Sequence, residues 1–236
     1  MKKIVKKFVK KLGFDIISNY QIERNDVYFH KQKLLNNINV ETVFDVGAAT
    51  GEFIEKYKQM FPNAQIYAFE PRKDVFQYIK DHYKYCNSFN IALSDKIGES
   101  SFFITKNTAS SSLYKPIIEG NAIEKHTSIS EKINVKTDTI DNFCKLNKIK
   151  RINLLKMDVQ GAELDILKGA TFLLENKNID LIYTEVEFGK IYTDQPLFHH
   201  IALFLEKYNY TLYNLYNSVY QDNSKLFWAD ALFIKN

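Results

Sequence analysis

VFDVGAATGEF, residues 43–53, is the stretch that decides the fold. It runs apolar as far as Asp45 and then places Gly47 and Gly51 four residues apart, in a chain with only eight glycines. An apolar run that ends in such a turn predicts a strand leading into a helix. Glycine tolerates a positive φ and lets the backbone approach a ligand closely. The turn is therefore also a candidate binding loop.

Strands and helices are predicted to alternate on either side of this stretch, because short apolar runs are interleaved with apolar residues at helical spacing. The predicted strands are 39–45, 65–70, 88–93, 100–105, 133–137, 152–158, 179–187, 211–217 and 226–236. The predicted helices are 51–61, 72–85, 139–147, 162–176 with a break at Gly169, and 196–210. This alternation is typical of an α/β fold with a doubly wound, mostly parallel sheet. The two late strands predict an antiparallel hairpin at its edge.

Composition indicates the class of protein. Of 236 residues, 45% are hydrophobic and 25% are charged, as in a soluble globular protein. The net charge is +4, but residues 1–11 hold six lysines, and the remainder has 26 basic against 28 acidic side chains. No nucleic-acid partner is therefore expected. Cys86 and Cys144 indicate reduced thiols of a cytoplasmic protein, and neither a membrane-spanning segment nor a signal peptide is predicted.

Residues 1–13 are predicted to form a basic amphipathic helix ahead of a single domain at 14–236. On a helix the apolar side chains of this segment fall on one side and its lysines on the other, and Gly13 follows where a helix would stop. Such a helix can lie on an anionic membrane, here the inner face of the cell membrane. It can equally pack on its own domain or on a partner subunit, and both interpretations stay open.

Acidic residues mark the ends of four predicted strands: Asp45, Glu70, Asp158 and Glu185. Ligands of parallel sheets bind at the carboxyl ends of the strands. The turn at 47–51 lacks the middle glycine of the dinucleotide fingerprint and the Lys-Ser/Thr of a phosphate-binding loop. Asp45 suits an ammonium group rather than a phosphate, and Glu70 can accept the hydroxyls of a ribose. A nucleoside with a cationic amino-acid tail and no phosphate describes S-adenosylmethionine.

From about residue 40 to 188 the chain resembles the FkbM-type methyltransferase family, within the class I S-adenosylmethionine-dependent methyltransferases. The resemblance rests on VFDVGAATGEF, IYAFEP, NIALSD, TIDNFC and, most specifically, LLKMDVQGAELDILKGA. It implies a seven-stranded Rossmann-like sheet and O-methyl transfer, often to a sugar of a glycan or of a glycosylated natural product.

The resemblance also implies site residues. In chain order, they would contact the methionine part of the cofactor, then its ribose, then its adenine and finally the reacting methyl. The expected cofactor-binding residues are Asp45, Gly47, Ala48, Gly51, Glu70, Pro71, Asn90, Ile91, Ala92 and Asp158. This chain departs from the family at two positions, since Ala49 stands where Asn is common and Gln160 stands where Glu is common.

Transfer of a methyl group to a sugar hydroxyl is helped by a base, by roughly 10²–10⁴-fold. Asp158 and Glu185 are the candidates, with helix capping as the alternative for Asp158. The cluster with Ser111 and Ser112 is typical of a solvated loop, whereas the resemblance implies a serine pair near the mouth of the site that contacts cofactor or sugar. His126 lies in a polar segment that could cover the substrate. Carboxylates suit a divalent metal ion, but no residue spacing indicates one.

The predicted function is therefore that of an S-adenosylmethionine-dependent O-methyltransferase acting on a carbohydrate or glycoconjugate. Two alternatives stay open: a nicotinamide-dependent oxidoreductase on a similar sheet, and a non-catalytic, membrane-attached binding protein with a degenerate cofactor site. The spacing of the turn and Asp45 argue against the first. The set Asp45, Gly47, Gly51 and Glu70 argues against the second.

Overall fold

The computed structural model describes residues 26–117, 128–222 and 224–236. Contacts divide the chain into two units, Met1–Asn39 and Val40–Asn236. The described part of the first unit contains the helix α3 (Val27–Leu35). The predicted helix at residues 1–13 lies outside the described residues, and the predicted domain start at residue 14 stays a prediction.

The second unit is built on a seven-stranded sheet. Its strands are β1 (Thr42–Val46), β2 (Gln65–Phe69), β3 (Asn87–Phe89), β7 (Ile152–Met157), β8 (Ile179–Glu187), β9 (Tyr210–Gln221) and β10 (Lys225–Lys235). They follow the order β3-β2-β1-β7-β8-β10-β9. The first five in chain order run parallel, and β10 runs antiparallel to both of its neighbours. This confirms the predicted Rossmann-like sheet with an antiparallel edge hairpin, in which the last strand inserts between β8 and β9.

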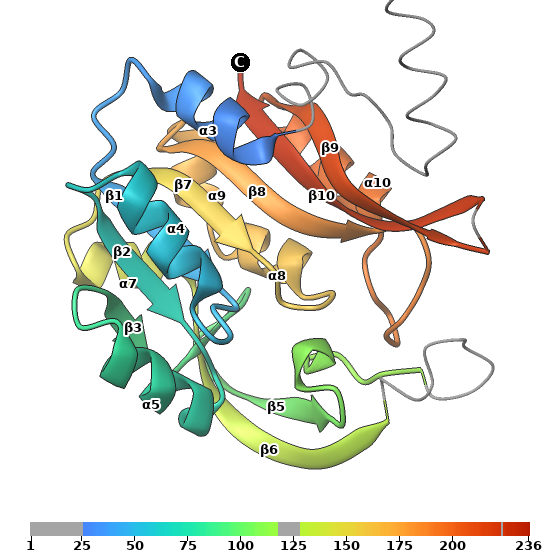
Figure 1. The fold of residues 1–236 in the computed structure, drawn as a ribbon. Helices are drawn as coiled ribbons and strands as arrows, with labels where there is room; N and C mark the ends of the chain where they lie inside the picture. The colour runs from blue at the N-terminus through green and yellow to red at the C-terminus, as the bar shows by residue number, and fades with distance from the viewer. Residues whose placement is uncertain (1–25, 118–127, 223) are drawn as a thin grey trace, which may run out of the picture. The chain divides into compact units, whose positions relative to one another are not determined.

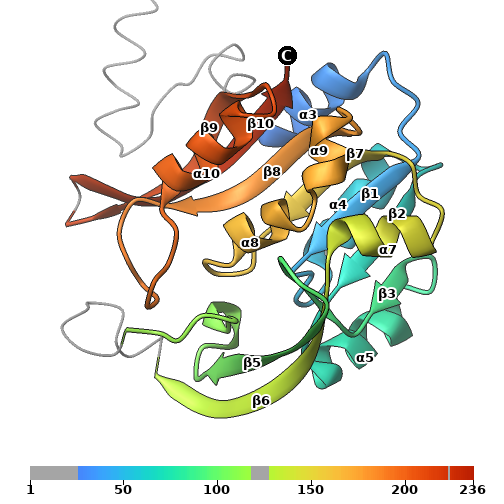
Figure 2. The ribbon, with the colours of Figure 1, turned by 180° about the vertical axis from the view of Figure 1, so that it is seen from behind.

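Helices cover both faces of this sheet, as a doubly wound fold requires. Figure 1 shows α4 (Glu52–Met60) against one face, and α5 (Lys73–His82) follows β2. The opposite face carries α7 (Ile140–Leu146), α8 (Glu163–Lys168), α9 (Thr171–Glu175) and α10 (Phe198–Glu206), which Figure 2 shows from behind. The main hydrophobic core lies between this second layer and the strands, and includes Phe44, Phe143, Leu155 and Ile182. Gly169 separates α8 from α9, as predicted.

A smaller sheet leaves the large one after β3. It consists of β4 (Ala92–Leu93), β5 (Gly98–Thr105) and β6 (Ile129–Asp138) in the order β4-β6-β5, with a 3-10 helix η1 (Thr108–Ser110) after β5. Figure 1 shows β5 and β6 at the end of the large sheet toward which the arrowhead of β2 points. The prediction of one strand at 88–93 was wrong. The chain changes sheet at Asn90, whose side chain bonds the carbonyls of the neighbouring turn instead of continuing the ladder.

The predicted helix at 196–210 is also shorter than expected. It is helical only from Phe198 to Glu206, and Tyr210 already begins β9. Among the described residues, none of the helices combines the length and the apolar character needed to cross a membrane.

Candidate active site

The turn after β1 is shaped by its two glycines. Gly47 has φ +73° and Gly51 has φ +83°, both in the left-handed region. A Cβ on Gly47 would lie 2.0 Å from the carbonyl oxygen of Asp158, and a Cβ on Gly51 would lie 2.4 Å from the ring of Tyr83. Only glycine therefore lets this turn approach the turn that follows β7, the neighbouring central strand.

Glu70 follows β2 and is bonded to the same turn. Its side chain is buried, and its carboxylate accepts hydrogen bonds from the backbone N–H of Ala49 (3.2 Å) and of Arg72 (2.9 Å). Asn90 Nδ2 donates to the carbonyls of Glu70 (2.9 Å) and Pro71 (2.8 Å), which fixes the backbone there. Burial raises the pKa of Glu70, and the two backbone N–H groups and Arg72 partly oppose this.

A cavity of about 270 Å³ lies between the turns that follow β1, β2 and β7. The predicted site residues on its wall are Gly47, Glu70, Pro71, Ile91, Ala92, Ser111 and Asp158. The wall is completed by Val46, Ala49, Thr50, Phe69, Arg72, Val75, Leu93, Phe102, Ala109, Leu113, Val159 and Gln160. A mostly apolar hollow with a few convergent polar groups is typical of a small-molecule site. The remaining predicted residues in the described part lie off this wall: Asp45, Ala48, Gly51, Asn90, Ser112 and Glu185.

Asp45 forms a buried ion pair with Lys156, its cross-strand partner on β7. Lys156 Nζ lies 3.0 Å from Asp45 Oδ1, and it also donates to the carbonyl of Gly47 (3.0 Å). The ring of Phe53 covers the ammonium at 4.7 Å. Burial lowers the pKa of Lys156, but Asp45 and Asp158 raise it and the net direction is upward. Asp45 thus acts on the turn through Lys156, and its predicted contact with the cofactor stays a prediction.

Asp158 and Glu185 are brought together by the side chain of Gln160. Gln160 Nε2 donates to Asp158 Oδ1 (3.2 Å) and to Glu185 Oε2 (2.6 Å). Its Oε1 accepts from the hydroxyl of Tyr192 (3.0 Å). Because carboxylates accept hydrogen bonds, the NH₂ end of the amide has to face them. Helix α8 begins after Ala162 without a side-chain cap, so Asp158 does not play the alternative capping role.

Two other carboxyl groups act on this pair, Glu187 on β8 and Glu163 on α8. Burial is the main cause that raises the pKa of Glu185 well above its ordinary value, and the charges of Asp158 and Glu187 add to it. Burial also raises the pKa of Glu187 well above its ordinary value, and the charge of Glu163 adds to it. Burial raises the pKa of Glu163 to about 7, although the backbone N–H of Val159 opposes this. Part of the cluster is therefore protonated near neutral pH.

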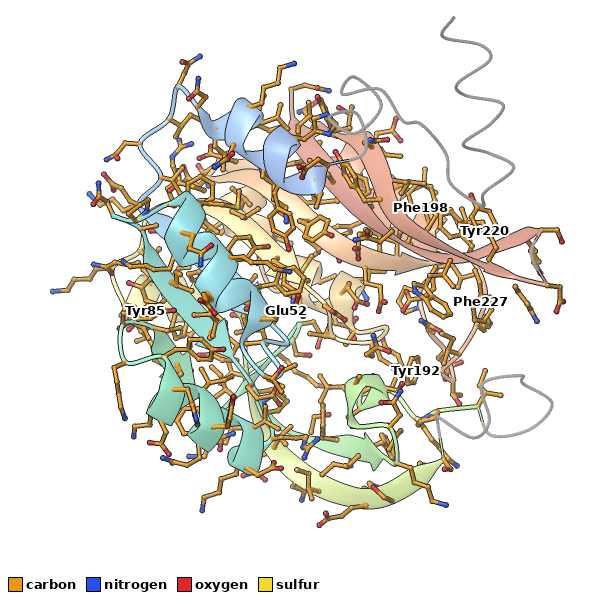
Figure 3. The ribbon with its side chains drawn as sticks, viewed as in Figure 1. Glu52, Tyr85, Tyr192, Phe198, Tyr220 and Phe227 are labelled. Atoms are coloured by element: carbon orange, nitrogen blue, oxygen red, sulfur yellow. The ribbon has the colours of Figure 1, made fainter. Side chains whose placement is uncertain are left out.

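Two segments, 108–117 and 188–197, meet at Gln160. Ser112 is fully buried and donates through Oγ to the carbonyl of Gln160 (2.7 Å). The single hydroxyl hydrogen of Tyr192 is shared between Gln160 Oε1 and the carbonyl of Ser110 (2.9 Å). Figure 3 shows Tyr192, which belongs to the loop after β8, beside the segment that contains η1. Ser111 lines the cavity, so of the two predicted serines one can reach a ligand and the other holds the backbone.

Comparison with known proteins places this geometry in a family. A family model described as a methyltransferase FkbM domain matches residues 45–212. The chain belongs to the FkbM methyltransferase domain family. The matched range begins at Asp45 and includes the glycine turn, Glu70 and the Asp158–Gln160–Glu185 group.

Curated relatives and solved structures agree with this family. The 2-O-methyltransferase NoeI of Sinorhizobium fredii is 26% identical over 167 residues, which is 66% of this chain and 65% of that protein. The hexuronic acid methyltransferase AglP of Haloferax volcanii is 28% identical over 120 residues, or 50% of this chain and 46% of that protein. A methyltransferase FkbM from Methylobacillus flagellatus has the same fold, with a TM-score of 0.51 at 14% identity over 83% of this chain and 44% of that one. The chain thus spans less than two thirds of each of these three proteins.

S-adenosylmethionine is the methyl donor of this family, and the residues present fit it. The close approach at Gly47 leaves room for backbone but not for a side chain at that part of the wall. The buried carboxylate of Glu70 is also on the wall and offers acceptors for hydroxyl groups. Ile91 and Ala92 supply apolar wall where an aromatic base would pack.

Several residues of the site were not found from the sequence. Tyr192 and the bridging role of Gln160 depend on contacts between distant segments, which no local pattern reveals. Lys156 could have been found, since a lysine inside the apolar run INLLKM predicts a buried ion pair. His126 lies outside the described residues. Within 26–117, 128–222 and 224–236, no three His, Cys, Asp or Glu side chains are arranged to hold a metal ion.

Proposed function

We propose that the protein transfers a methyl group from S-adenosylmethionine to a hydroxyl of a sugar in a glycan or glycoconjugate. The observation that carries the proposal is that one cavity is lined by the glycine turn, by Glu70 and by Asp158. The names of two relatives support the finer points, since one is a 2-O-methyltransferase and another acts on a hexuronic acid.

The chain's own residues have distinct tasks in this reaction. Glu70 accepts the ribose hydroxyls of the donor, and the turn at Gly47 holds its amino-acid end through backbone groups. When bound, S-adenosylmethionine supplies a methyl group already activated by a positive sulfur. Orientation is then the main contribution of the protein, worth up to about 7–11 kcal/mol in favourable cases. Asp158, which lines the cavity, is the proposed acceptor of the proton of the acceptor hydroxyl.

Asp158→Asn tests this assignment. The variant keeps the shape of the side chain but cannot act as a base, so we expect loss of most methyl transfer with binding of S-adenosylhomocysteine retained. The assay is transfer of tritiated methyl from S-adenosylmethionine to a set of defined neutral, amino and acidic glycosides. Full transfer by the variant would remove Asp158 from the mechanism. Transfer by the wild type to none of the glycosides would count against a sugar acceptor.

A further inference from the structure

Glu185 lies among acidic groups from several neighbouring elements. These are Asp158 after β7, Glu187 on β8 itself, Glu163 on α8 and Asp230 on β10, the register partner of Glu185. Asp230 is already satisfied, because it accepts hydrogen bonds from Tyr183 (2.6 Å) and Asn217 (2.6 Å).

No basic side chain forms an ion pair with this group within the part of the chain that the structure describes, although the charge of Asp158 acts on Lys156. None of the ion pairs there involves Asp158, Glu163, Glu185 or Glu187. The nearest lysine on β7, Lys156, is paired with Asp45. Buried carboxyl groups in such a setting hold protons unless a positive charge arrives. The cluster therefore responds to the charge of whatever fills the adjoining cavity.

Gln160 joins Glu185 to that cavity. Its Nε2 carries two hydrogens, one directed to Asp158 on the wall and one to Glu185 behind it. The amide can hold both carboxylates when both are ionised, and still holds them when one is protonated. A glutamate at this position has no N–H to give. Tyr192 fixes the amide from the other side by donating to its oxygen.

We propose that Asp158 and Glu185, held by Gln160, form a pair that gives up a proton when the cationic methyl donor binds and regains one when the methyl group is transferred. The proposal rests on the proposed function. In the transfer, the hydroxyl oxygen bonds to the methyl carbon and the C–S bond breaks with its electron pair left on sulfur. The hydroxyl proton passes to Asp158, and exchange with solvent returns the resting proton to Glu185, because the Gln160 amide donates to both carboxyl groups and cannot carry a proton between them. Positive charge leaves the cavity as the proton is produced, so the pair's affinity for the proton rises when it is needed. Gln160 is a positioning residue.

Calorimetry tests this without an acceptor. Binding of S-adenosylmethionine and of S-adenosylhomocysteine is measured near pH 7 in two buffers with different ionisation enthalpies, which gives the protons exchanged. The two ligands differ in the sulfonium methyl and its charge. We expect the first to release more protons than the second, by up to about one per molecule bound. Equal proton release in the wild type would overturn the proposal without recourse to any variant.

Variants then locate the proton. Glu185→Gln should abolish the difference between the two ligands while S-adenosylhomocysteine still binds. Gln160→Glu should change the difference, and the exposed Glu131→Gln should leave it as in the wild type. An undiminished difference in Glu185→Gln would exclude Glu185 as the group that retains the proton. Binding of neither ligand to the wild type would instead contradict the proposed function itself.

Discussion

Glu163→Gln is expected to stabilise the protein at pH 8 far more than at pH 5. Glu163 is 1% exposed, and burial raises its pKa from 4.5 to about 7. The folded state therefore keeps this proton at pH values where the unfolded chain has lost it. The associated stability is complete below the unfolded pKa and is lost as the pH rises through 7. The full difference corresponds to about 3 kcal/mol, of which about 2 kcal/mol is lost between pH 5 and pH 8.

The glutamine variant isolates this effect because its amide oxygen can still accept the hydrogen bond that Glu163 takes from Val159 N (2.9 Å). Urea unfolding at the two pH values gives the free energy of unfolding of both proteins. The difference in free energy of unfolding between variant and wild type should be about 2 kcal/mol larger at pH 8 than at pH 5. The exposed Glu131→Gln serves as control and should show no widening. A gap that is the same at both pH values would refute the argument that Glu163 is protonated in the fold.

Two further predictions concern charge elsewhere in the chain. Lys156→Met removes the ion-pair partner of the buried Asp45 and should lower the free energy of unfolding in urea by about 3–5 kcal/mol. The double variant with Asp45→Asn should recover much of this loss. Equal losses in the single and double variants would contradict a charge effect. Deletion of residues 1–12, which carry the lysine-rich segment, should reduce co-sedimentation of the protein with anionic vesicles but not with neutral ones. Unchanged co-sedimentation would favour packing of this segment on its own domain or on a partner subunit.

The sequence predicted most of the strands and helices because the signals for them are local. The run up to Asp45, the turn with two glycines and the apolar strands at 152–158 and 179–187 each report on their own segment. The prediction failed at 88–93, where the chain leaves one sheet for another. That change depends on Asn90 bonding two carbonyls of the turn after β2, a contact across 20 residues.

The site was predictable to the extent that parallel strands bring their ends together. The acids at the strand ends led to Glu70, Asp158 and Glu185 as candidate site residues. What the sequence did not reveal is which carboxylates are neutralised inside the fold. Asp45 forms an ion pair with Lys156, whereas no ion pair among the described residues involves Asp158, Glu163, Glu185 or Glu187.

The most direct test of the methyltransferase assignment is calorimetric binding of S-adenosylhomocysteine and of NAD to the wild type and to Glu70→Ala. The account predicts micromolar binding of S-adenosylhomocysteine and none of NAD. The variant should bind at least about tenfold more weakly, since hydrogen bonds to a charged group are worth about 1.5–3 kcal/mol. Binding of NAD alone, or of neither ligand, would contradict the assignment of the cavity.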